Sequence, residues 1–184
     1  MRSIVQVGDP VLRMLAKEIP VDAIDSPRIR GIIADMRELL ANAEFGVAIA
    51  APQVGESLRM FIVAGAGALK RRRNEAKKDD EESDDSYFDG MPEEDEVYIN
   101  PVLVKMSRGK KDKHEGCLSV RGKWGEVPRA EKATIQAYNE HGKKIERGAS
   151  GFLAHIFQHE MDHLDGILYI DKATSLYDDE RNKK

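Results

Sequence analysis

The stretch SGFLAHIFQHEMDHL, residues 150–164, predicts an α-helix that Gly166 ends shortly afterwards. His159 and His163 are four residues apart, so on a helix one imidazole lies above the other and both can reach a single metal ion. Glu160 follows the first histidine and projects close enough to act on a water that such an ion activates. Ordinary surface or core histidines produce the same pattern by chance, so the rest of the chain has to decide between the two interpretations.

A catalytic metal usually has three protein ligands and one open position, so this site needs a third ligand. His155 continues the same helix face, but it lies about 12 Å along the axis from His163, too far for one ion to bridge all three histidines. It is therefore predicted to be a neighbour of the site. Cys117 is the best candidate, because a glycine precedes it and nearby strands could lie alongside the helix. A plain buried cysteine is an equally good interpretation of this residue alone, and His114 and His141 are weaker candidates.

Short apolar runs elsewhere in the chain predict β-strands. They cover residues 58–63, 97–99, 102–104, 133–138, 143–146 and 167–170. A second helix should begin after Ser26 and continue to about Asn42, because isoleucine, methionine and leucine recur there at helical spacing. Several strands grouped around one central helix predict an α+β fold, with mixed or antiparallel strands packed around the metal-binding helix.

The length predicts a single domain over residues 1–184, which is long enough to form a hydrophobic core. Residues 68–96 form a mixed-charge run with few apolar side chains, which predicts a mobile insertion on the surface. The net charge of −4 gives no reason to expect a membrane or a specific nucleic-acid partner. The single cysteine excludes an internal disulfide, and no signal-like segment or membrane-length apolar run is present, so a cytoplasmic location is expected.

Three motifs carry a resemblance to the peptide deformylase family. That family has the ordered patterns Gly-x-Gly-[Leu/Ile]-Ala-Ala-x-Gln, Glu-Gly-Cys-Leu-Ser and Gln-His-Glu-x-Asp-His. They appear here, in the same order, as residues 46–53, 115–119 and 158–163. Shorter matches cover residues 8–13, 99–101, 127–130 and 162–166. Three spaced motifs together are highly specific, and the chain resembles peptide deformylases over nearly its whole length outside residues 68–96.

The resemblance implies a role for each matching residue. Three side chains would bind one divalent metal ion: Cys117, His159 and His163. Glu160 would be the general acid and base, and Gln53 with the backbone N–H of Leu118 would stabilise the oxyanion. The ion would be Fe²⁺, with Zn²⁺, Ni²⁺ or Co²⁺ as alternatives that the same ligand types accept.

The family also binds its peptide as an added β-strand. The resemblance places this pairing edge at Phe45, Gly46 and Val47, while Ile156 on the long helix would line an apolar pocket for methionine. Glu115 and Arg129 match family positions suited to a structural ion pair near the metal, although two independently solvated charges are the alternative.

The predicted protein is thus a metal-dependent hydrolase that removes the N-formyl group from N-terminal formylmethionine of newly synthesised polypeptides. Its partners would be these peptide ends, with the ribosome as a further candidate. One alternative is a catalytically impaired homologue that binds peptide or metal, because Ala48 replaces a family glycine and Arg121 stands where proline is common. A zinc endopeptidase built on His-Glu-x-x-His is a weaker alternative, since Cys117 and Gln53 already have roles in deformylation.

Overall fold

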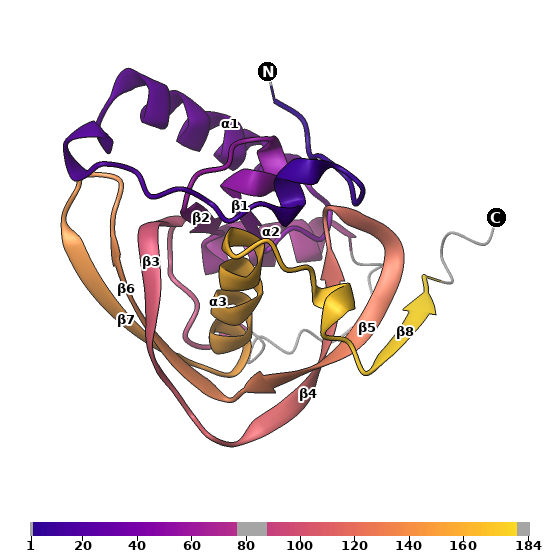
Figure 1. Ribbon diagram of the computed structural model, residues 1–184. Coiled ribbons are helices and arrows are strands. Elements are labelled where there is room, and N and C mark those ends of the chain that lie inside the picture. The colour runs from indigo at the N-terminus through magenta and orange to yellow at the C-terminus, as the bar shows by residue number, and fades with distance from the viewer. Residues whose placement is uncertain (1, 77–87, 180–184) are drawn as a thin grey trace.

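The computed structural model describes residues 2–76 and 88–179, and in these residues it contains three α-helices and two antiparallel β-sheets (Figure 1). The helices are α1 (Pro27–Asn42), α2 (Ala66–Ala76) and α3 (Gly151–Leu164). The larger sheet has the order β1-β2-β3-β6-β7, with β1 (Ala48–Ala50), β2 (Met60–Val63), β3 (Glu96–Met106), β6 (Lys132–Tyr138) and β7 (Lys144–Ser150). The smaller sheet has the order β4-β5-β8, with β4 (Lys110–Cys117), β5 (Val120–Ala130) and β8 (Ser175–Asp178).

Within the described residues, four short 3-10 helices with defined bounds connect these elements. They are η1 (Pro10–Arg13), η2 (Val21–Ala23), η3 (Ala51–Val54) and η5 (Tyr169–Asp171). Among the described residues, no helix combines the length and the apolar character that crossing a membrane requires. The predicted α+β class with antiparallel strands is confirmed.

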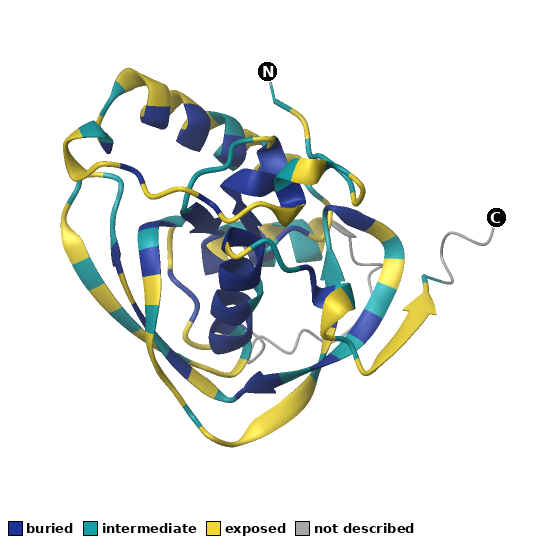
Figure 2. Ribbon diagram, in the orientation of Figure 1, coloured by how far each residue is buried: buried dark blue, intermediate teal, exposed yellow. Residues whose placement is uncertain are grey.

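Helix α3 lies in the middle of the molecule, enclosed by strands of both sheets (Figure 1). It contacts β1, β6 and β7 of the larger sheet and β5 of the smaller one. Eleven of its fourteen residues are buried, and its ribbon is almost entirely dark blue in Figure 2. A helix covered on all sides can hold polar side chains only where they find partners, so its histidines and acids mark an internal polar site.

Two apolar clusters form the core, and α3 contributes most of its buried apolar side chains to the larger one. In the main core, the Phe61 ring of β2 stacks on Tyr98 of β3 at 4.9 Å, and Tyr98 meets Phe157 of α3 edge-on at 5.2 Å. The smaller sheet packs on a separate group: Leu12, Val120, Val127, Leu168 and Tyr169. Cys117, the last residue of β4, packs against this second group.

The two helices predicted from apolar periodicity are present. Helix α1 begins at Pro27 after Ser26, whose Oγ accepts a hydrogen bond from the Ile29 N–H at 3.4 Å, and it ends at Asn42 as expected. Helix α3 begins one residue after Ser150 and ends at Leu164. In each case a capping signal agrees with a continuous apolar face.

Residues 68–96 were predicted to be a mobile surface insertion without a helix or strand of its own. That prediction is wrong for the first part of the segment, which belongs to α2. Residues 66–76 form a helix, in which Leu69 is 6% exposed, and beyond it Phe88 and Met91 are 9% and 6% exposed. Leu69 is far from the other two apolar side chains in the sequence, and all three pack in the main core. Residues 77–87 of the predicted insertion lie outside the described residues, and its mobility and the single-domain boundary stay predictions.

Other strand predictions need correction. Residues 167–170 do not form a strand, because the Asp171 carboxylate accepts a hydrogen bond from the Leu168 N–H at 2.8 Å and bends this segment into η5. The apolar runs at 97–99 and 102–104 belong to one strand, β3, with an irregular register between Ile99 and Val102. Asn100 has a φ of 50° there and bonds the backbone of Ile19 through both side-chain atoms.

Candidate metal centre

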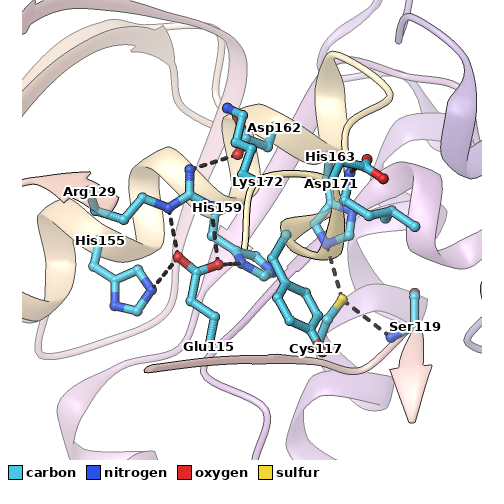
Figure 3. Close-up of polar contacts among 12 residues, drawn as sticks. Glu115, Cys117, Ser119, Arg129, His155, His159, Asp162, His163, Asp171 and Lys172 are labelled. Atoms are coloured by element: carbon cyan, nitrogen blue, oxygen red, sulfur yellow. Dashed lines mark hydrogen bonds and ion pairs between the residues drawn. The ribbon is translucent and has the colours of Figure 1, made fainter. Parts of the chain in front are cut away.

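The three residues predicted as metal ligands lie together. Cys117 ends strand β4, and His159 and His163 project from α3 toward it (Figure 3). Their donor atoms all lie within 4.8 Å of one another, and Cys117 Sγ is 3.2 Å from His163 Nε2. At usual metal–sulfur and metal–nitrogen bond lengths, donors around a tetrahedral ion lie roughly 3.3–3.6 Å apart. The thiolate and two imidazoles therefore fit one divalent ion.

The other histidines lie outside this donor set. His155 Nε2 is 2.9 Å from Glu115 Oε1, on the side of the carboxylate away from Cys117 (Figure 3). It is a neighbour of the site, as the helix geometry predicts. His114 stacks on the Trp124 ring at 4.7 Å, and His141 is exposed in the turn before β7.

The predicted ion pair between Glu115 and Arg129 is present and buried. Arg129 Nε donates to Glu115 Oε1 at 2.6 Å, and Arg129 Nη2 donates to Oε2 at 3.1 Å. Glu115 Oε2 also accepts a hydrogen bond from His159 Nδ1 at 2.7 Å. A carboxylate can only accept, so His159 carries its proton on Nδ1 and leaves the Nε2 lone pair for an ion.

The polar network continues through α3 to the surface. Arg129 Nη1 donates to Asp162 Oδ2 at 2.6 Å, and Lys172 Nζ donates to Asp162 Oδ1 at 2.6 Å (Figure 3). The carboxylates of Glu115 and Asp162 thus face the side chains of Arg129 and Lys172. Pairing opposite charges in this way offsets the desolvation penalty of burying them. The sequence reasoning did not assign roles to Asp162 and Lys172. Asp162 lies inside the third motif and could have been found there, whereas nothing in the sequence connects it with Lys172.

The electrostatics of the cluster favour a cation between the donors. Burial would raise the pKa of Glu115, but its hydrogen bonds with His155, His159 and Arg129 outweigh burial and hold that pKa well below its ordinary value. Burial disfavours the charged form of His159, yet hydrogen bonds to Cys117 and Glu115 raise its pKa well above the ordinary value, so without an ion its Nε2 also holds a proton, which a bound metal ion would displace. Burial lowers the pKa of His163, which keeps its imidazole neutral as a ligand must be.

Glu160 is buried beside this cluster, and one of its oxygens is unpartnered. The residue is 3% exposed, and Oε2 makes no hydrogen bond within the described part of the chain. A buried carboxylate oxygen without a partner is costly and calls for an explanation. Burial raises the pKa of Glu160 to about 7. An acid in this state is suited to exchange a proton with a small polar molecule at the site.

The two predicted oxyanion donors adjoin Cys117. Gln53 Oε1 accepts a hydrogen bond from the Ala50 N–H at 2.8 Å, which turns its amide NH₂ toward Cys117 Sγ, 3.5 Å away, and Ser119 Oγ, 3.3 Å away. Leu118 lies in the turn between β4 and β5, and its carbonyl accepts a hydrogen bond from the Gln6 side chain at 3.0 Å. Ser119, fully buried, was missed by the sequence reasoning although it lies in the second motif.

The predicted peptide-pairing residues precede β1, which is an edge strand of the larger sheet. Phe45 is 55% exposed and Gly46 is buried. The Val47 carbonyl accepts a hydrogen bond from the Ala64 N–H at 2.9 Å, so the opposite edge of this segment faces away from β2. Ile156 is 3% exposed and packs in the main core. Their roles in substrate binding stay predictions.

A thiolate and two imidazoles beside a buried, unpartnered carboxylate make up the kind of centre found in mononuclear metal-dependent hydrolases. The sequence model of the family described as Polypeptide deformylase matches residues 1–179. The peptide deformylase of Halothermothrix orenii is 41% identical over 172 residues, covering 93% of this chain and 92% of that protein. The chain therefore belongs to the peptide deformylase family, whose members are metal-dependent enzymes.

Solved structures agree with this assignment. The crystal structure of a peptide deformylase from Legionella pneumophila matches with a TM-score of 0.75 and 33% identity, covering 95% of this chain and 86% of that one. A Met-Ala-Ser-bound peptide deformylase from Acinetobacter baumannii, described as class I type b, matches with a TM-score of 0.75 and 29% identity, covering 94% and 98%.

Proposed function

We propose that this protein removes the formyl group from N-terminal formylmethionine of newly synthesised polypeptides, at a centre formed by three ligands and one acid. The ligands are Cys117, His159 and His163. Glu160 is the general acid and base. The observation that carries the proposal is the clustering of the three donor atoms beside a buried carboxylate whose Oε2 lacks a partner. Membership of the peptide deformylase family supports the reaction itself.

The donor set suits a divalent transition metal. When bound, such an ion supplies Lewis-acid activation of water and of the formyl oxygen. The family resemblance leads us to assign Fe²⁺ as the working ion, and Zn²⁺, Ni²⁺ and Co²⁺ stay alternatives because thiolate and imidazole ligands accept all four. Elemental analysis of protein purified without oxygen distinguishes them.

Glu160 moves the proton in this mechanism. Its carboxylate accepts a proton from the water that attacks the formyl carbon, and the resulting acid donates that proton to the amine nitrogen as the C–N bond breaks. The products are formate and a peptide with a free α-amino group. The pKa of about 7 supports this exchange near neutral pH. A nearby cation would lower that pKa, which favours the carboxylate at the start of the reaction.

Gln53 and Leu118 stabilise the developing negative charge. The Gln53 amide NH₂ and the Leu118 backbone N–H both adjoin Cys117, and the bond from Ala50 to Gln53 Oε1 fixes the direction of the amide. Donors that are held in place before the reaction cost no reorganisation when the oxyanion forms. Loss of one such donor typically lowers kcat by about 10²–10³.

The peptide would add as a strand along Phe45, Gly46 and Val47, at the edge that faces away from β2. The main support is the free edge of the sheet, together with the Met-Ala-Ser bound to the Acinetobacter baumannii relative. Ile156 would contribute to an apolar pocket for the methionine side chain. A formyl group is small, so a site walled by Gly46 and its small neighbours would reject larger acyl groups.

Formate release from formyl-Met-Ala-Ser by anaerobically purified, iron-loaded protein tests the proposal, with acetyl-Met-Ala-Ser as the matched control. We expect turnover of the formyl peptide alone. Binding of the peptide without turnover by metal-loaded protein would support the impaired homologue, and cleavage of internal peptide bonds would support the endopeptidase. The proposal also includes a cytoplasmic location and contact with ribosomes, and co-sedimentation with ribosomes tests that contact.

A further inference from the structure

The Arg72 side chain of α2 reaches back to the turn that joins α1 to β1. Its Nη1 donates to the Leu40 carbonyl at 2.8 Å and to the Ala43 carbonyl at 2.6 Å. Its Nη2 donates to the Gly46 carbonyl at 2.7 Å. One guanidinium from the charged segment after β2 thus holds three carbonyls of residues 40–46.

The Leu40 and Ala43 carbonyls also accept weaker backbone hydrogen bonds, from the N–H groups of Ala43 at 3.3 Å and Gly46 at 3.1 Å, and Arg72 adds shorter, charged donors to both. The last carbonyls of a helix have no partner within the helix, and a cation at this end is also favoured by the helix dipole. A planar guanidinium carries five N–H donors in a fixed arrangement, so it can bond several carbonyls at once. Burial lowers the pKa of Arg72 and the Asp95 carboxylate opposes this shift, but an arginine this basic keeps its charge.

Gly46 connects this turn with the catalytic motif. A Cβ at Gly46 would lie 2.8 Å from Ala43 Cβ, 3.0 Å from Leu40 Cδ1 and 3.5 Å from Leu118 Cδ1. Its N–H donates to the Ala43 carbonyl at 3.1 Å, while its carbonyl is held by Arg72. Both backbone groups of this tightly packed glycine are therefore fixed, one from the turn and one from α2.

The direction of the Gly46 carbonyl matters because of strand alternation. The Val47 carbonyl faces β2 through its bond from Ala64, so the backbone groups of Ala48 point to the opposite edge. The Gly46 peptide group comes just before this edge in the chain, and its own N–H and carbonyl are already bonded to Ala43 and Arg72. A rotation of that group would disturb the hydrogen-bond pattern available to the added strand.

We propose that Arg72 is a positioning residue for the peptide substrate: it holds the Gly46 carbonyl and, through it, the edge of β1 in the conformation that pairs with the peptide. Arg72 itself touches neither the metal ligands nor the reacting atoms. The inference rests on the proposed function only in requiring a peptide at this edge, and it gives the charged segment after β2 a role in substrate binding.

The test compares Arg72→Met, which removes the donors, with Arg72→Lys, which keeps the charge and part of the hydrogen bonding. Arg71→Met is the matched control, because Arg71 is the preceding, exposed residue of the same helix. Steady-state kinetics with formyl-Met-Ala-Ser should show KM raised about tenfold in Arg72→Met with kcat within about twofold of wild type. Arg72→Lys should recover part of the loss, and Arg71→Met should match wild type.

A substitution that only destabilised the fold would not raise KM while leaving kcat nearly unchanged. The increase in KM should be smaller for formyl-Met, which is too short to extend along the edge. An unchanged KM in folded Arg72→Met, or a fall in kcat alone, would overturn the inference. If Arg72→Met does not fold by circular dichroism, a wild-type KM in Arg72→Lys overturns it instead.

Calorimetric binding of Met-Ala-Ser separates this inference from the proposed function, because it needs no turnover. The dissociation constant should rise about tenfold in Arg72→Met. Wild-type protein that binds Met-Ala-Ser but releases no formate would contradict the proposed function alone. Equal affinity in wild type and Arg72→Met would contradict the role of Arg72 alone.

Discussion

The Glu115 carboxylate accepts hydrogen bonds from three side chains at once, and His159 is one of them. The bond to His159 Nδ1 holds the ring with Nε2 toward Cys117, and the bonds from Arg129 fix the carboxylate in turn. Partners of this kind orient a metal ligand and raise its basicity. The donor geometry therefore depends on a residue that binds no metal itself.

Glu115→Gln should weaken metal binding while leaving all three donors in the chain. The amide keeps the shape but loses the negative charge, so His159 becomes a poorer ligand and Arg129 keeps only Asp162 as a carboxylate partner. We expect metal affinity to fall about 10–100-fold, measured by competition with a chromophoric chelator. Glu38→Gln, an exposed change on α1, is the control. Equal affinities in wild type and Glu115→Gln would contradict the orienting role.

At the residue scale, the sequence predicted the residues to which the family resemblance gives a role, and it missed contacts that form only when separate elements pack together. The resemblance pointed to Cys117 and Gln53, and these residues meet in the structure. The links from Arg129 to Asp162 and from Asp162 to Lys172 were not anticipated, because they join residues that come together only when β5, α3 and η5 have packed. Lys172 comes directly after η5, where the sequence predicted a strand at residues 167–170.

Among the elements, α1 and α3 were predictable because each combines a cap signal with a continuous apolar face. Helix α2 was not, because its sequence is rich in arginine and, of the side chains described, only Ala66 and Leu69 are buried. The sequence also did not predict strands β4 and β5. Their residues are mostly charged on the outside and give no clear two-residue apolar alternation.

The end of α3 depends on Gly166. This glycine has a φ of 73°, and a Cβ there would lie 2.7 Å from the Arg13 carbonyl oxygen and 2.8 Å from the Arg13 carbonyl carbon. Gly166→Ala should therefore lower the free energy of unfolding by about 2 kcal/mol, measured by urea denaturation.

Gly31→Ala on α1 is the matched control for that experiment. Gly31 has a helical backbone, and an added Cβ would meet no atom of the described residues within 4 Å. This change should raise the free energy of unfolding by roughly 0.5–1 kcal/mol. The same sign of effect for both substitutions would contradict the proposed tight contact at Gly166.

For the whole molecule, the metal centre joins the two sheets through α3. Cys117 belongs to the smaller sheet, while α3 packs mainly on the larger one. An ion held by ligands from both parts binds the folded chain and not the unfolded one. Such binding stabilises the fold by about 4 kcal/mol when the ion is present at 1,000 times its Kd.

Removing the metal should therefore lower Tm by roughly 10 °C, measured by calorimetry before and after chelation and on reloading. Cys117→Ala should lose most of this shift. His141→Ala, which removes an exposed imidazole outside the donor set, should keep it. A full shift in Cys117→Ala would show that the stabilising ion binds elsewhere.

At this scale the α+β class followed from several predicted strands around one helix, and the family followed from the order of three motifs, while the pairing of strands into two separate sheets could not be predicted. The order β1-β2-β3-β6-β7 leaves β4 and β5 to form another sheet with β8. That division depends on packing against α3 and the Leu12 cluster, which no local sequence pattern records.

The most direct test of the account is formate release by Glu160→Ala, measured together with its bound metal. The substitution leaves all three donors in place, so metal content should equal that of wild type. Turnover of formyl-Met-Ala-Ser should fall by at least about 10³, because the substitution removes the proposed general acid and base. Retained turnover at full metal occupancy would contradict the role of Glu160 and, with it, the proposed mechanism.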